Sequence, residues 1–218
     1  MTTLNHMPDP ADEIRAALVE MADPARAPDM QRYMKSQMPY LGVRKTELTR
    51  RVMRLAKGLD RAAMLATAGE LWDGATHREE RYAALAVLRV GRLTAADEPL
   101  LRHLITTGAW WDLVDEIATK LVGALRAELD LRAWSRDDDL WIRRAAIISQ
   151  VGRRGRGTDP RLLADVITPN TEDRRFWITK AIGWALRDYA YADPQWVRDF
   201  VDGHDLAPLS VREATKHL

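Results

Sequence analysis

Residues 176–189 read FWITKAIGWALRDY, and their spacing is that of a helix with two different faces. Ile178, Ile182 and Leu186 recur every four residues, so they predict one buried side. The opposite stripe combines aromatic and basic side chains, namely Trp177, Lys180, Trp184 and Arg187. A core helix does not need such a stripe, although packing alone remains open. Gly183 would let a partner helix or a ligand approach closely.

Helical spacing of apolar residues continues along most of the chain, and signals for strands are nearly absent. Helices are expected over residues 12–21, 29–38, 46–57, 60–72, 77–90, 94–107, 111–125, 139–151, 159–167, 171–191, 194–201 and 209–217. Short links favour antiparallel helical pairs, and these pairs recur roughly every 30–40 residues. The pattern predicts an all-α fold, a right-handed solenoid of HEAT-like or armadillo-like repeats. An irregular helical bundle is the alternative. The concave face of a solenoid suits a rod-like ligand.

The charge of the chain is nearly balanced overall but unevenly distributed. The formal net charge is +1, and of the 33 basic residues 27 are arginine and six are lysine. Basic residues dominate two segments, 44–57 and 143–161, which predicts one basic and one acidic face. Arginine matches phosphate geometry, although a genome rich in G and C also enriches arginine without a functional cause.

Composition excludes several kinds of chemistry. Cysteine is absent, which excludes disulfides, thiol nucleophiles and thiolate metal sites. The five histidines show no ligand spacing, and the turn at residues 152–157 lacks the ending of a phosphate-binding loop. We therefore expect no metal and no cofactor. The start of the chain is polar, and no apolar run is long enough to span a membrane, so a cytoplasmic location is expected.

The segment WWDLVD, residues 110–115, carries two indoles and two carboxylates. Trp111 and Asp115 are four residues apart, so a helix brings them onto one face. An aromatic face beside a carboxylate suits stabilisation of a cation. Trp110 projects about 100° away from Trp111, so we expect one indole in the core and the other at a site. Asp112 fits the negative charge favoured in a first helical turn.

Two further segments have weaker signals. In residues 140–146, LWIRRAA, Arg143 and Arg144 border an apolar face. Contact with a phosphate and an ordinary salt bridge are equally compatible with that position. Residues 33–43, YMKSQMPYLGV, resemble a helix end followed by a structural corner.

Taken together, these segments resemble the AlkD-like alkylpurine DNA glycosylases, a family built from HEAT-like helical repeats. The resemblance extends from about Tyr33 to Val201. It rests on YMK and PYLG at residues 33–35 and 39–42, WWDLVD at 110–115, WIRR at 141–144 and KAIGWALR at 180–187. It implies one repeat domain over residues 1–218, with a concave basic face that binds DNA. The first 30 residues match no motif of the family, and the link between Asp115 and Arg143 is short.

The resemblance implies excision of positively charged N3- and N7-alkylated purines from double-stranded DNA, without flipping of the base. Asp115 then corresponds to the catalytic carboxylate, and Trp111 and Trp184 to aromatic walls beside the sugar. The DNA-binding residues implied are Tyr33, Arg143, Arg144, Lys180 and Arg187. A cationic base leaves without a strong acid and no lysine Schiff base is needed, so we expect a monofunctional enzyme. We also expect a monomer.

Other functions remain open at this stage. Members of this family include general repair enzymes and self-resistance enzymes that remove bulky adducts of genotoxic natural products. A non-catalytic DNA-binding module of helical repeats is an alternative of another class, although the retained Asp115 counts against it. A helical scaffold that binds protein is disfavoured by the two basic segments.

Overall fold

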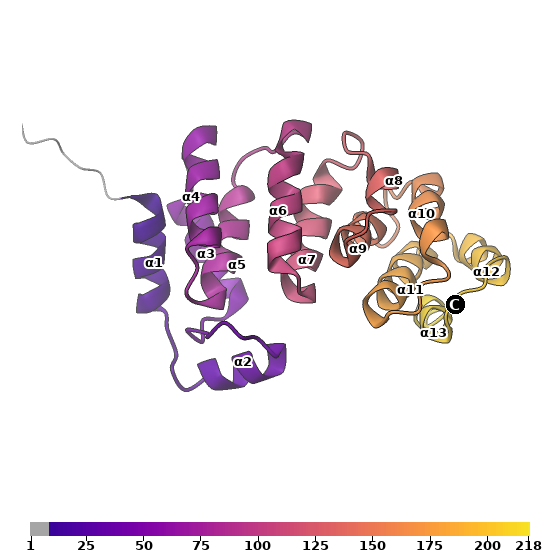
Figure 1. Cartoon of the computed structure of the whole chain (residues 1–218), viewed down its shortest axis with the longest axis horizontal. Coiled ribbons are helices and arrows are strands. Elements are labelled where there is room, and N and C mark those ends of the chain that lie inside the picture. The colour runs from indigo at the N-terminus through magenta and orange to yellow at the C-terminus, as the bar shows by residue number, and fades with distance from the viewer. Residues whose placement is uncertain (1–8) are drawn as a thin grey trace, which may run out of the picture. The chain divides into compact units, whose positions relative to one another are not determined.

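The computed structural model describes residues 9–218, and Figure 1 shows that these are helical. They form thirteen α-helices and no strand, which confirms the all-α prediction. No helix in this range is long and apolar enough to cross a membrane. The described chain forms two compact units, one ending at Arg92 and the other spanning Leu93–Leu218. The expected single domain and right-handed solenoid stay predictions, and the polar start at residues 1–8 lies outside the described residues.

The first unit is built around its last helix. Its helices are α1 (Pro10–Glu20), α2 (Ala27–Met34), α3 (Lys45–Leu55), α4 (Arg61–Asp73) and α5 (Arg78–Leu88). Seven consecutive residues of α5, Tyr82–Leu88, are buried. A helix that is apolar on all sides belongs inside a core, and α5 packs against α1, α3 and α4.

A buried carboxylate holds the corner between α2 and α3. Glu79 is fully buried, and its two oxygens accept hydrogen bonds from the backbone N–H groups of Leu41, Gly42 and Val43 at 2.9–3.1 Å. Gly42 adopts a φ of 86°, and a Cβ there would lie 2.1 Å from the carbonyl oxygen of Asp23. The structural corner predicted within residues 33–43 is therefore present.

The second unit holds the remaining helices. Its α-helices are α6 (Glu98–Gly108), α7 (Trp111–Glu116), α8 (Leu131–Trp134), α9 (Leu140–Ile148), α10 (Pro160–Ile167), α11 (Phe176–Ala190), α12 (Pro194–Asp202) and α13 (Pro208–Ala214). Short helical turns of other types are η1 (Ala95–Asp97), η2 (Ile117–Leu121), η3 (Val122–Ala124) and η4 (Thr168–Asn170). The longest helix, α11, packs against α9, α12 and α13, and its predicted side of Ile178, Ile182 and Leu186 is buried.

The bounds of most predicted helices differ from the structure by a few residues, and two predictions differ most. The helix expected over 171–191 begins only at Phe176, because the Asp173 carboxylate accepts from the backbone and the guanidinium of Arg175 in a local turn. The helix expected over 111–125 is α-helical only to Glu116 and continues as the π-helical η2 and the 3-10 turn η3. The four-residue α8 was not predicted, because so short a segment has no measurable periodicity.

At Gly183 the helix α13 approaches α11 closely, which is one of the two possibilities, a partner helix or a ligand, that the sequence predicted. A Cβ on Gly183 would lie 2.5 Å from the Cβ of Glu213, 3.0 Å from the carbonyl oxygen of Ser210 and 3.3 Å from its Cα. The buried Ser210 hydroxyl also donates to the carbonyl oxygen of Thr179 at 2.9 Å. Only glycine fits at this crossing without displacement of backbone.

Gly183→Ala is expected to destabilise the protein by about 1–3 kcal/mol, because the added methyl meets the backbone of α13. Gly69→Ala in α4 is the matched control, since a Cβ at Gly69 meets nothing within 4 Å. That change is expected to stabilise the protein by up to about 1 kcal/mol through helix propensity. Urea unfolding of both variants measures the effect, and equal stability of the two would contradict the close approach.

Candidate active site

A cavity of about 320 Å³ opens in the second unit between α7, α9 and α11. Its lining consists of Trp111, Asp115, Arg144, Phe176, Trp177, Lys180, Trp184 and Arg187. The catalytic residues expected from the sequence, Asp115, Trp111 and Trp184, all contribute to this lining. The fold therefore brings together segments that are more than 60 residues apart in the chain.

The carboxylate of Asp115 is held by a two-pronged ion pair. Arg144 donates from Nε to Oδ1 at 2.7 Å and from Nη2 to Oδ2 at 2.9 Å. Its remaining nitrogen, Nη1, donates to the carbonyl oxygen of Trp177 at 2.6 Å. The Arg144 side chain is only 5% exposed, whereas the Asp115 side chain keeps 17% of its surface exposed. The guanidinium thus fixes the orientation of the carboxylate from the protein side and leaves it accessible from the cavity.

The chain geometry changes directly after Asp115. The π-helical turn η2 begins two residues later, at Ile117, and the Thr119 hydroxyl donates to the carbonyl oxygen of Asp115 at 2.7 Å. Such single π turns are frequent at functional sites. The change in helix type therefore lies within two residues of Asp115, the residue that the sequence singled out.

An aromatic cluster borders the cavity, and two of its members, Phe176 and Trp177, line it. The rings of Trp110 and Trp141 lie 5.4 Å and 5.5 Å from the ring of Trp177, and the ring of Phe176 lies 4.9 Å from it. The guanidinium of Arg144 lies 5.7 Å from the Trp177 ring. Trp110 thus joins this aromatic cluster but is only half-buried, and Trp111, also half-buried, lines the cavity. The role of Trp111 at a site stays a prediction.

Two basic side chains at the cavity share one carboxylate. Lys180 pairs with Oε1 of Glu213 at 3.1 Å, and Arg187 pairs with the other oxygen of the same group. Hydrogen bonds from Lys180 and then Arg187 hold the pKa of Glu213 below its ordinary value, against a smaller opposing effect of burial. Glu213 therefore stays ionised at neutral pH.

Arg143 does not line the cavity, although it is adjacent in sequence to Arg144. Its guanidinium donates to the carbonyl oxygen of Asp137 at 2.7 Å and to the carboxylate of Asp173 at 3.1 Å. In this structure both arginines form salt bridges, which is one of the two alternatives that the sequence left open. Contact of Arg143 or Arg144 with a phosphate stays a prediction, and for Arg144 it would require partial release of Asp115.

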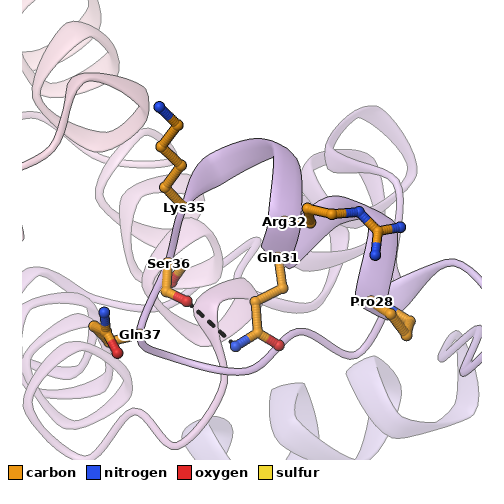
Figure 2. A pocket seen from close by; sticks show the side chains of 6 residues that line it. All are labelled: Pro28, Gln31, Arg32, Lys35, Ser36 and Gln37. Atoms are coloured by element: carbon orange, nitrogen blue, oxygen red, sulfur yellow. Dashed lines mark hydrogen bonds between the residues drawn. The ribbon is translucent and has the colours of Figure 1, made fainter.

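Tyr33 belongs to the first unit, where it lies one residue before the end of α2 and is 75% exposed. Beside it, at the end of α2, the side-chain amide of Gln31 donates a hydrogen bond to the carbonyl oxygen of Ser36 (Figure 2). A hollow of about 440 Å³ lies at this end of α2, bordered by the basic side chains of Arg32 and Lys35. Because Tyr33 is exposed, its side chain is accessible to a ligand.

Sequence reasoning missed two contributors to the site. Glu213 was not singled out, because only the fold brings α13 beside α11. The close approach expected at Gly183 was the one feature of the sequence that pointed to this contact. It did not show that α13 would be the helix that approaches. Phe176 was noted only as part of a helix, yet it lines the cavity and is 54% exposed. Among residues 9–218, no three acidic or histidine side chains are grouped so as to hold a metal ion.

Comparison with known proteins identifies relatives of this chain. A family model described as DNA alkylation repair enzyme matches residues 14–218. A solved structure of a predicted DNA alkylation repair enzyme from Enterococcus faecalis is 27% identical in sequence. Its TM-score is 0.79, and the match covers 91% of this chain and 97% of that one. No curated protein matches.

The Asp115–Arg144 pair is expected to behave as one unit in stability measurements. Arg144→Met leaves a partly buried carboxylate without its main partner and is expected to cost about 3 kcal/mol. In the double variant Asp115→Asn with Arg144→Met, no charge is left behind, so the loss should be smaller than the sum of the single losses. Urea unfolding of all four proteins gives the coupling energy, and additive losses would contradict the pair.

Proposed function

The chain belongs to the DNA alkylation repair enzyme family, and on that basis we propose that it is a monofunctional DNA glycosylase. Its proposed substrates are positively charged N3- and N7-alkylated purines in double-stranded DNA. The observation that carries this proposal is the Asp115 carboxylate, which Arg144 orients within a cavity that also contains Trp111 and Trp184.

The chemistry of such a substrate matches these groups. In an alkylated purine of this kind, the bond from the sugar C1′ to the base breaks and its electron pair neutralises the base. The base leaves without a strong acid, while positive charge develops on the sugar. Asp115 stabilises that charge, and each indole adds cation–π attraction of about 1–2 kcal/mol once water is displaced. Water then adds to C1′ and loses a proton, which yields an abasic site and a free neutral base.

Arg144 serves in this proposal as a positioning residue. Its two prongs keep the carboxylate plane fixed, and its third hydrogen bond to Trp177 ties that plane to α11. A group that is already oriented before the substrate arrives does not have to reorganise as charge develops. The electrostatic contribution of Asp115 is larger for that reason.

Lys180 and Arg187 are the proposed contacts to the DNA backbone beside the lesion, because both line the cavity that contains Asp115. Tyr33 and Arg143 are proposed as further DNA contacts from outside this lining. Binding through backbone groups, without enclosing the base, would leave room for large alkyl groups. General repair is the proposed role, and removal of bulky natural-product adducts is the alternative within the same chemistry.

Asp115→Asn is expected to lower the rate of base release from duplex DNA containing N7-methylguanine by about 100-fold or more. Trp184→Ala is expected to lower it by roughly ten-fold, through loss of one cation–π contact. Single-turnover assays with excess protein measure both rates. Asp165→Asn is the control, since it removes a carboxylate paired with Arg132 outside the cavity. The proposal fails if the wild type releases no base above the spontaneous rate.

The charge of the lesion, more than its size, is expected to determine excision. Duplexes with N7-methylguanine and N3-methyladenine should release base, whereas a neutral lesion such as hypoxanthine should not. The DNA product should carry an intact strand with an abasic site, because no lysine Schiff base is involved. Excision of hypoxanthine at a comparable rate would contradict stabilisation of a cationic base. Preference for bulky N7-guanine adducts over methyl adducts would favour the self-resistance role.

A further inference from the structure

Glu213 lies between the two basic side chains that the proposed function assigns to the DNA backbone. One of its oxygens pairs with Lys180 at 3.1 Å and the other with Arg187, and its side chain keeps 15% of its surface exposed. The carboxylate thus occupies the kind of position that a phosphate would take, since both anions accept from a guanidinium and an ammonium group.

The fold places Glu213 there through backbone contacts. Lys180, Gly183 and Arg187 are three and four residues apart on α11, so they share one face of that helix. The missing side chain at Gly183 admits α13, and the Cβ of Glu213 comes to lie over the gap between the two basic residues. The adjacent position of α11 and α13 is visible in Figure 1.

The charges of this group do not cancel completely. Two cations share one carboxylate, which leaves one excess positive charge at the edge of the cavity. Because the pKa of Glu213 is lowered, its carboxylate is ionised at neutral pH, and the three side chains together carry one positive charge. Nη1 of Arg187 donates to one oxygen of Glu213, and Nζ of Lys180 pairs with the other. A phosphate that binds both of these nitrogens at the position of the carboxylate must therefore displace it from at least one of them.

We propose that Glu213 limits the affinity of this protein for DNA, because its carboxylate competes with a backbone phosphate for Lys180 and Arg187. This inference rests on the proposed function, since it requires DNA as the ligand. Backbone contacts supply affinity that does not depend on the base. A built-in competitor at such a contact shortens the time that the protein spends on undamaged duplex. Glu213 is accordingly an affinity-determining residue and takes no part in the bond-breaking step.

Direct binding to an undamaged duplex tests the inference without any dependence on catalysis. Glu213→Gln keeps the shape of the side chain and removes its charge. We expect it to bind DNA about three- to ten-fold more tightly than wild type at roughly 100 mM salt. The slope of log affinity against log salt should steepen by about one, because one more cation is available to a phosphate. Fluorescence anisotropy with a labelled duplex, from about 50 to 200 mM salt, measures both quantities.

Matched variants separate this competition from the overall charge. Asp165→Asn makes the same change in net charge at an arginine-paired carboxylate outside the cavity, and it should leave the affinity close to wild type. Glu213→Asp keeps the charge and should also remain close to wild type. An affinity gain in Glu213→Gln no larger than that in Asp165→Asn overturns the inference, as does unchanged or weaker binding.

The remaining outcomes are also decisive. Glu213→Ser is a second neutral variant in case Glu213→Gln does not fold, and unfolding of both would show that Glu213 acts in stability, which overturns the inference. A wild type that binds DNA but releases no base contradicts the proposed glycosylase, while the binding comparison still tests Glu213. A wild type that binds no DNA contradicts both.

Discussion

The ion pair between Asp115 and Arg144 is the interaction on which the second unit and its cavity both depend. Asp115 belongs to α7 and Arg144 to α9, and the third hydrogen bond of Arg144 reaches the backbone of α11 at Trp177. Burial of an ion pair is costly unless further hydrogen bonds satisfy the remaining donors. Here every nitrogen of the guanidinium has an acceptor. The contacts that join three helices therefore also set the orientation of the proposed catalytic group.

The two sides of α11 have different roles, since one packs in the core and the other lines the cavity. The side with Ile178, Ile182 and Leu186 is buried, while the stripe from Trp177 to Arg187 faces the cavity. Between them, Gly183 receives α13 and with it the carboxylate of Glu213. One helix thus supplies an aromatic wall, two cations and the contact surface for their counter-charge. A small residue in the middle of a long helix has a structural reason here, namely the approach of a second backbone.

Much of this arrangement was predictable from local patterns. Four-residue spacing identified the buried side of α11, and the same spacing placed Trp111 and Asp115 on one face of α7. Patterns of this kind describe a single helix. They do not predict which side chain of another helix a residue contacts. The two-pronged pair of Arg144 with Asp115 joins residues 29 positions apart, so the sequence left phosphate contact and salt bridge equally open. The pairing of Glu213 with Lys180 and Arg187 could not be predicted, because it depends on the packing of α13 against α11. The late start of α11 likewise follows from a local turn at Asp173, which competes with helical hydrogen bonds.

The buried Glu79 of the first unit has a consequence for the order in which that unit folds. Its carboxylate supplies the acceptors for three consecutive amides, and those amides lie 36–38 residues earlier in the chain. Before α5 docks, residues 41–43 lack these acceptors, and closing a loop of this length has an entropic cost that local contacts do not offset. The corner and the central helix must therefore consolidate together. Amide hydrogens of Leu41, Gly42 and Val43 should accordingly exchange with solvent at the pace of the helix core, although they lie in a loop.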